Sequence, residues 1–137
     1  MYYMETIHRR TCVYQIGYHI VFCTKYRKKV LVGKVADDLL DIFQEIALEK
    51  GFTLVQQEAN EDHVHLFVSA PPHTSISALL KWIKGISARR LLAQYPRIRK
   101  QLYRGHLWNP SYYVGTVGDM SEEVVRKYIA NQKGKAD

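Results

Sequence analysis

The run from His63 to Val68 restricts the fold of this chain more than any other segment. Its histidines alternate with the apolar residues Val64 and Leu66, and an alternation with a period of two predicts a β-strand. Successive side chains of a strand point to opposite faces, so we expect His63 and His65 on the same face, with Phe67 beyond them. Two neutral imidazoles held side by side can chelate a divalent metal, although such histidines also occur as solvated or core residues.

The order of the strands and helices expected around this strand predicts the fold. Strands are expected at 11–25, 52–58, 63–69 and 107–117, and helices at 35–50, 76–94 and about 119–133. The order βαββαβ plus a C-terminal helix is that of the ferredoxin-like split βαβ arrangement, an α+β fold. This arrangement has an antiparallel four-stranded sheet with two helices on one face. The histidine pair would then lie on a middle strand, with the other sheet face open for a site.

Local signals place several element boundaries. Gly51 is expected to end the first helix, and Thr74 or Ser75 to cap the second. Pro96 is expected to break the second helix and to begin a basic linker over 97–104. Asp119, with Glu122 three residues later, has the pattern of a capping box at the start of the last helix.

Length and composition predict one soluble domain over residues 1–137, with a core at about 11–118. Of the 137 residues, 47% are hydrophobic and 24% are charged. No apolar run approaches the roughly 18–20 residues that span a bilayer, and the first residues lack the pattern of a signal peptide. We therefore expect no membrane association and a cytoplasmic location. Cys12 and Cys23 form no C-x-x-C pair, so we expect both thiols to stay reduced.

The charged residues are segregated along the chain, whose net charge is +7. Residues 6–36 and 63–118 contain no Asp or Glu, whereas 37–62 contain eight of the thirteen acids. A solvated surface would mix both signs, so the segregation favours a polyanionic partner such as nucleic acid. The candidate DNA-binding residues are Lys25, Arg27, Lys28, Lys29, Arg89, Arg90, Arg97, Arg99 and Lys100.

A tyrosine and an amide in the last expected helix could complete a metal site. Tyr128 and Gln132 are four residues apart and so share one helix face, although a tyrosine on a helix more often packs against its neighbours. A metal on two imidazoles keeps open positions for phosphate oxygens, and Gln132 can add a neutral amide oxygen. The Tyr128 hydroxyl could then attack a polarised phosphate. The resulting phosphotyrosine would retain the energy of the phosphodiester, which predicts cleavage and rejoining of DNA strands.

Several motifs together resemble one family. His63-Val64-His65 matches the HUH pattern (His, hydrophobic, His), and Tyr128 with Gln132 matches its nucleophile helix. The segments 18–27, 62–66, 107–112 and 115–118 match in the same order. From about Thr11 to Gln132 the chain resembles the small HUH single-tyrosine transposases of the IS-two-hundred and IS-six-hundred-and-five type, found in bacterial and archaeal insertion sequences.

This resemblance implies a detailed function. Such enzymes are homodimers that act on single-stranded DNA, recognise hairpins at the ends of the element, and form 5′-phosphotyrosine links with Mg²⁺ or Mn²⁺. Carried over by position, His63, His65 and Gln132 bind the metal and Tyr128 is the nucleophile. The resemblance also implies that the tyrosine helix can serve the histidine pair of the other subunit, which would make the site composite. A prokaryotic, cytoplasmic protein is expected.

Two other functions remain open from the sequence. The first is a non-catalytic or domesticated nucleic-acid-binding module, because ferredoxin-like sheets often bind single strands through aromatic residues and basic edges. The second is a relaxase or replication initiator with the same chemistry, although such chains are normally longer.

Overall fold

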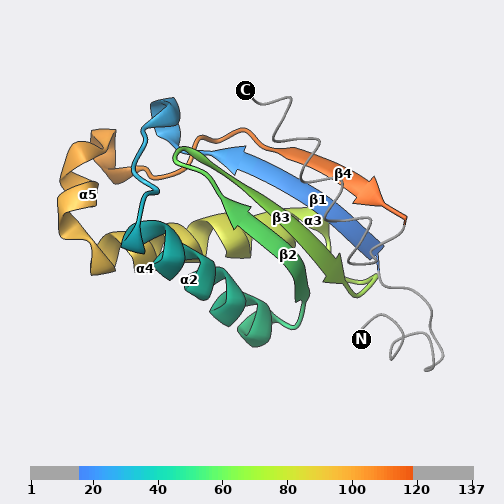
Figure 1. The fold of residues 1–137 in the computed structure, drawn as a ribbon. Coiled ribbons are helices and arrows are strands. Elements are labelled where there is room, and N and C mark those ends of the chain that lie inside the picture. The colour runs from blue at the N-terminus through green and yellow to red at the C-terminus, as the bar shows by residue number, and fades with distance from the viewer. Residues whose placement is uncertain (1–15, 119–137) are drawn as a thin grey trace.

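A single antiparallel sheet organises the molecule (Figure 1). The structure, a computed structural model, describes residues 16–118. The strands are β1 (Ile16–Cys23), β2 (Thr53–Ala59), β3 (His63–Ala70) and β4 (Tyr113–Val117), and they lie in the order β2-β3-β1-β4. All three pairings are antiparallel. The ferredoxin-like arrangement is therefore confirmed, and the strand that carries His63 and His65 lies in the middle of the sheet, as expected.

Two long helices pack together on one side of this sheet (Figure 1). The first is α2 (Lys34–Lys50), and the second runs through α3 (Ile76–Leu80), η2 (Lys81–Ile86) and α4 (Ser87–Gln94). Ser75 caps the second helix, since its Oγ accepts a hydrogen bond of 3.0 Å from the Ala78 amide. Gly51 follows α2 in the left-handed conformation, which a glycine adopts without strain.

The middle of the second helix is π-helical, which the hydrophobic periodicity did not predict. Its buried residues Leu79, Ile83, Ser87 and Leu91 recur every four residues. An α-helix has 3.6 residues per turn, so such a repeat drifts around its surface. The wider π turn offsets that drift and keeps these side chains against the sheet.

The hydrophobic core lies between the helices and one face of the sheet. Alternate residues of the middle strands are buried there, among them Ile20 and Phe22 of β1 and Val64, Leu66 and Val68 of β3. They belong to one cluster with Leu39, Phe43 and Ile46 of α2 and Leu79, Ile83 and Leu91 of the second helix. Because a strand alternates its side chains, the odd-numbered residues of β1 and β3 lie on the opposite face, which bears the histidines.

Two expectations about the region after Pro96 were wrong. The predicted linker is helical: α5 (Pro96–Gln101) begins with Pro96 in its first turn, where the missing amide hydrogen is tolerated, and Ile98 is buried. A short 3₁₀ turn, η3 (Tyr103–Gly105), follows. The fourth strand is shorter than predicted, because 107–112 contains Pro110 and contributes an isolated bridge between Trp108 and Thr24.

Polar contacts hold the segment before β4 in place. Trp108 is buried and its Nε1 donates to the Ser87 Oγ at 3.0 Å. The Lys84 Nζ donates to the main-chain carbonyls of Asn109 (2.7 Å), Pro110 and Ser111 (3.3 Å each). Much of the motif 107–112 therefore attaches β4 to the second helix.

Some predictions lie outside the described residues. These are the first part of the strand expected at 11–25 and the whole helix expected at 119–133, with Tyr128 and Gln132. Within residues 16–118, none of the helices combines the length and the apolar character needed to cross a bilayer.

Candidate functional site

The strand register builds a polar site on the sheet face that is opposite the core. His63 is aligned with Cys23 of β1, and His65 lies between Val21 of β1 and Glu58 of β2. The centroids of the two imidazole rings are 5.1 Å apart, and the rings meet edge to face. The alternation of β3 therefore brings the two side chains together on one face, as the sequence predicted.

The hairpin turn before β3 orients His63. Its Nδ1 lies 2.8 Å from Asp62 Oδ1, and its Nε2 lies 3.2 Å from the Asn60 Nδ2. Arg27 donates from Nε to the other oxygen of Asp62 at 3.0 Å. Burial by itself raises the pKa of Asp62, but the hydrogen bonds from His63 and Arg27 outweigh it, so the pKa lies below its ordinary value. An ionised Asp62 can thus accept a hydrogen bond from the His63 Nδ1.

Asp62 and Glu61 lie beside His63 in the hairpin turn, but only Asp62 contacts its ring. Asp62 takes the supporting position, since metal-binding histidines usually donate their other ring nitrogen to a carboxylate or carbonyl. Glu61 is exposed and accepts a main-chain hydrogen bond from Leu31 through its carbonyl.

A third histidine, which the sequence analysis did not identify, supports His65. His19 and His65 are both buried, with 1% and 3% of their surfaces exposed. The His19 Nε2 lies 3.2 Å from the His65 Nδ1, and the rings stack with centroids 5.4 Å apart. Burial, and to a smaller degree the proximity of His65, lowers the pKa of His19 to about 4. The period-two pattern of β1 could have placed His19 on this face, opposite Tyr18 and Ile20.

Aromatic residues complete the site around His19. Phe67 stacks on the His19 ring at 4.4 Å, and the Tyr113 ring meets it edge-on at 5.9 Å. Gly115 is aligned with His19 on β4, and a Cβ atom at Gly115 would lie 2.6 Å from the Tyr113 hydroxyl oxygen. Glycine is therefore required at this position to let the Tyr113 ring lie along the strand toward His19.

The donors on this face fit a divalent metal in type and orientation. Neutral imidazoles suit divalent transition metals, whereas Mg²⁺ and Mn²⁺ at such a site would take most of their ligands from oxygen atoms of water, phosphate or an amide. Each imidazole here has its Nδ1 in a polar contact. Within residues 16–118, His, Cys, Asp and Glu form no group of three that could hold a metal. A third protein ligand would therefore have to be of another type or come from elsewhere, and the predicted ligand Gln132 satisfies both conditions.

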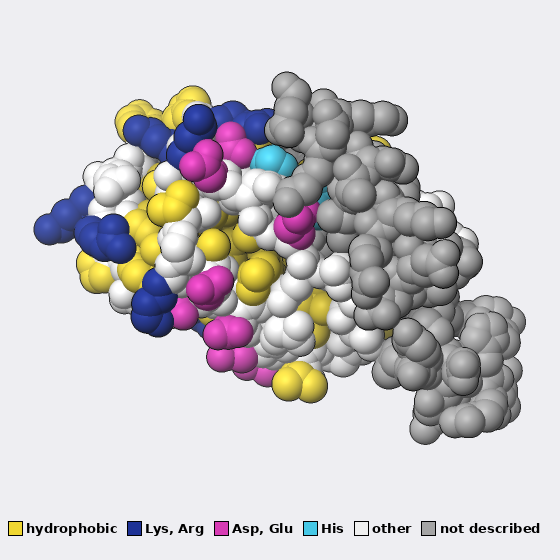
Figure 2. All heavy atoms as spheres, in the orientation of Figure 1, with side chains coloured by type: hydrophobic (Ala, Val, Ile, Leu, Met, Phe, Trp, Pro, Cys, Tyr) yellow, Lys and Arg dark blue, Asp and Glu magenta, His cyan; other side chains and the backbone are white. Residues whose placement is uncertain are grey.

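The structure separates the candidate DNA-binding residues into groups. Lys28 and Lys100 line one cavity, and Arg89 and Arg99 line another. Arg27 pairs with Asp62, and Arg90 pairs with Glu45 and Glu49 of α2 at 3.3 and 2.9 Å. Figure 2 shows Lys and Arg side chains gathered at the end of the molecule near α5, and the acids along α2. The residues already paired with a carboxylate are the weaker candidates for phosphate contacts.

Comparison with known proteins identifies the family. The family described as transposase IS200-like matches residues 12–132. The ISDra2 transposase TnpA of Deinococcus radiodurans is 45% identical over 126 residues, which cover 92% of this chain and 90% of that protein. The transposase for insertion sequence element IS200 of Salmonella typhimurium is 30% identical over 115 residues, with 84% and 75% covered.

Solved structures agree with this result. A crystal structure from D. radiodurans R1, assigned as a transposase, superposes with a TM-score of 0.74 at 43% identity and covers 90% of this chain and 95% of that one. A REP-associated tyrosine transposase bound to a REP hairpin has a TM-score of 0.59 at 12% identity, with 82% and 61% covered, and shares the fold. With a family match over most of its length and a histidine pair on the sheet face opposite the core, the chain belongs to the IS200-like transposases.

Proposed function

We propose that this protein cleaves and rejoins single-stranded DNA at insertion-sequence ends through a 5′-phosphotyrosine intermediate, with Mg²⁺ or Mn²⁺. The observation that carries the proposal is the pair His63 and His65 on the sheet face opposite the core, each with its Nδ1 held by a polar neighbour. Such an arrangement supports metal binding through the Nε2 atoms. Within a transposase family, the substrate of that metal is a DNA phosphodiester.

The supporting residues set the tautomers that this function needs. Asp62 accepts a hydrogen bond from the protonated His63 Nδ1, which leaves a lone pair on the Nε2. A metal on this Nε2 would replace its contact with the Asn60 Nδ2. A neutral His19 can accept in the same way from the His65 Nδ1. His63, His65 and Gln132 would hold the metal, which polarises the scissile phosphate and offsets the negative charge that develops on it.

The strand exchange then takes place on Tyr128. Its hydroxyl oxygen forms a bond to phosphorus while the bond from phosphorus to the 3′-oxygen breaks. The tyrosine loses its proton and the departing oxygen takes one up, so the products are a 5′-phosphotyrosine and a free 3′-hydroxyl. Rejoining is the reverse exchange: a 3′-hydroxyl attacks the phosphotyrosine, and Tyr128 leaves with its proton restored.

The decisive test is a covalent adduct between protein and DNA. Single-stranded DNA incubated with the protein and Mg²⁺ should yield a complex that survives denaturing electrophoresis, and EDTA should prevent it. Tyr128→Phe should remove the adduct and leave DNA binding nearly unchanged. An adduct in Tyr128→Phe would redirect the search for the nucleophile to Tyr113 on the histidine face. DNA binding without any adduct would favour a non-catalytic binding module.

Hairpin recognition and dimerisation are further parts of the proposal. A solved transposase of the same fold is bound to a REP hairpin, which supports a hairpin substrate here. A hairpin oligonucleotide should bind more tightly than a scrambled strand of the same length. Equal affinities would refute end recognition, even if cleavage occurs.

We further propose a homodimer in which Tyr128 of one subunit serves the histidines of the other. Mixing Tyr128→Phe with His63→Ala protein should restore cleavage, because a mixed dimer contains one intact composite site. If activity does not return although subunit exchange is demonstrated, each chain builds its own site.

A further inference from the structure

We propose that the cavity between η1 (Lys25–Arg27) and the α5–η3 segment binds an unpaired base of the DNA substrate. This inference rests on the proposed function, because it takes single-stranded DNA as the ligand. The base would stack on Tyr26 or Tyr103, and Lys28 would contact an adjoining phosphate. We name this site the base cavity; it is lined by Tyr26, Lys28, Lys100, Gln101, Leu102 and Tyr103.

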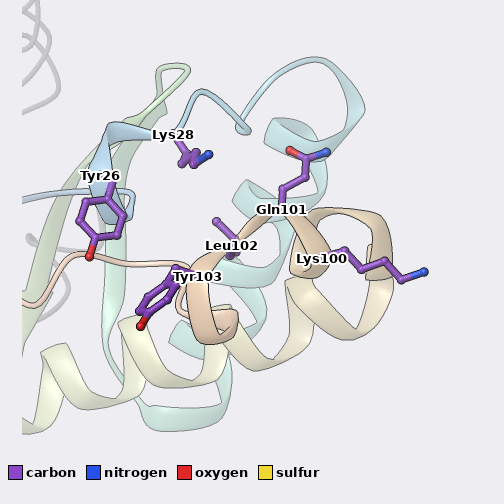
Figure 3. A pocket seen from close by; sticks show the side chains of 6 residues that line it. All are labelled: Tyr26, Lys28, Lys100, Gln101, Leu102 and Tyr103. Atoms are coloured by element: carbon purple, nitrogen blue, oxygen red, sulfur yellow. The ribbon is translucent and has the colours of Figure 1, made fainter.

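The size and lining of the base cavity suit a nucleotide. Its volume is about 560 Å³, within the range of about 300–1,000 Å³ that is usual for small-molecule sites. Figure 3 shows Tyr26 and Tyr103 on the same side of the cavity, although they come from η1 and η3, whereas Lys100 extends away from both rings. The described residues that line it include no carboxylate, so a phosphate meets no like charge there.

The two tyrosines have the exposure and the charged neighbours of a stacking platform. Tyr26 is 67% exposed and Tyr103 is 58% exposed, far more than rings that pack in a core. Each ring has a cation near its face: the Lys25 Nζ lies 5.3 Å from the Tyr26 centroid, and the Arg104 guanidinium carbon 5.1 Å from that of Tyr103. Alternating aromatic and basic residues bind single strands by stacking and by neutralising phosphates.

The main chain around the tyrosines adopts conformations that are costly without glycine. Tyr26, Arg27 and Arg104 have φ values of 58°, 54° and 55°. Such conformations cost on the order of 1 kcal/mol each and cluster at ligand-binding segments. The structure holds η1 in this shape, because the Thr24 Oγ1 donates to the Lys28 carbonyl at 2.8 Å and the Lys25 amide donates to the Leu107 carbonyl at 2.8 Å. Tyr26 is thus presented outward on a firmly anchored turn.

The base cavity is connected to the histidine site through Arg27. Its guanidinium binds Asp62, and Asp62 binds His63. Cys23, three residues before Tyr26, is the register partner of His63. A base stacked on Tyr26 would therefore lie at the end of the sheet where His63 is located. We infer that the site positions the single strand that leads to the scissile phosphate.

Fluorescence of 2-aminopurine tests this inference without cleavage. The probe is a DNA hairpin with a single-stranded flank in which one base at a time is replaced by 2-aminopurine, titrated in EDTA. Stacking on a tyrosine should quench the fluorescence at one position of the flank. Alanine at the tyrosine on which the base stacks, Tyr26→Ala or Tyr103→Ala, should abolish the quenching and weaken binding roughly 5- to 100-fold, whereas phenylalanine at the same position should retain both properties.

Leu48→Ala is the matched control, because Leu48 is also exposed but lies on the acidic helix α2. If both alanine variants remain folded and bind the flank as tightly as Leu48→Ala, the base cavity is refuted. A loss of affinity that is equal for a fully paired duplex would also refute it. Adduct formation with Mg²⁺ at saturating DNA separates the two proposals: an adduct without quenching overturns this site alone, and quenching without an adduct overturns the cleavage proposal.

Discussion

The two faces of the sheet are built from the same strands, yet they depend on different physical effects. On the helix side, Ile20, Val64 and Leu66 are buried in the core. On the other side, His19 and His65 are just as buried, but the His19 Nε2 and the His65 Nδ1 are in polar contact and the two rings stack. The degree of burial alone therefore does not distinguish the core face of the sheet from the face that bears the histidines. What distinguishes the faces is the polar partners of the buried groups, which a core does not need.

The largest expected effect is on catalysis, from the histidine face. His63→Ala or His65→Ala should abolish adduct formation, because each removes one of the two proposed imidazole ligands. His63→Ala should change the free energy of unfolding by about 1 kcal/mol, less than a fully buried core residue would, since 15% of the side chain remains exposed. Adduct assays, Mn²⁺ titration calorimetry and urea unfolding of the same samples check this. Cleavage at the normal rate in both variants would refute the metal site.

Substitutions on the core face of the sheet should reduce stability rather than activity. Leu66→Ala removes a fully buried side chain from the core and should destabilise the protein by about 2–5 kcal/mol. At a temperature where the variant is still folded, its adduct formation should remain measurable. Urea unfolding checks the first part. A Leu66→Ala protein that is stable but inactive would contradict the separation of the two faces.

The polar partners of the histidines should have intermediate effects. Asp62→Asn weakens the hold on the His63 Nδ1–H and should reduce metal affinity by about 10- to 100-fold. His19→Gln should have a similar effect through His65. Glu61→Gln is the control, because its side chain is exposed in the same turn. If Mn²⁺ affinity is the same in all three variants, these residues do not position the ligands.

Burial of His19 also predicts a dependence of stability on pH. The unfolded chain takes up a proton on this residue near its ordinary pKa of 6.5, whereas the folded protein does so only near pH 4. The free energy of unfolding should therefore fall as the pH is lowered from 6.5 toward 4. His19→Gln should make this slope shallower, and urea unfolding in EDTA over that range measures it. Equal slopes in the two proteins would mean that His19 takes up its proton at the same pH in the folded protein as in the unfolded chain.

The smallest expected effect concerns two adjacent arginines. Arg89 lines a cavity with Arg99, whereas Arg90 is held by the carboxylates of Glu45 and Glu49. Arg89→Ala should weaken binding of single-stranded DNA and reduce the slope of log affinity against log salt by about 0.7. Arg90→Ala should leave that slope unchanged, and loss of its exposed ion pairs should change stability little. If Arg90→Ala changes the slope more than Arg89→Ala does, Arg90 rather than Arg89 contacts the phosphates.

Local pattern was sufficient for most of the fold. The expected strands and helices predicted the order of elements, and with it the central position of β3. The signals that predict them are short-range, so a sequence displays them directly. The alternation in the run from His63 to Val68 was enough to place His63 and His65 on one face.

The remaining features depend on contacts between segments that are distant in the chain. Pro96 begins α5, because Ile98 packs into the core, and only tertiary contacts reveal that preference. The partnership of His19 with His65 spans 46 residues and follows from the register of β1 and β3. The ion pairs of Arg90 with α2 likewise depend on how the helices pack. The position of Tyr26 and Tyr103 on one cavity depends on how η1 and η3 pack. The sequence by itself determined which residues could carry the chemistry, whereas the tertiary structure decided their neighbours, because a neighbour's identity depends on how separate elements pack.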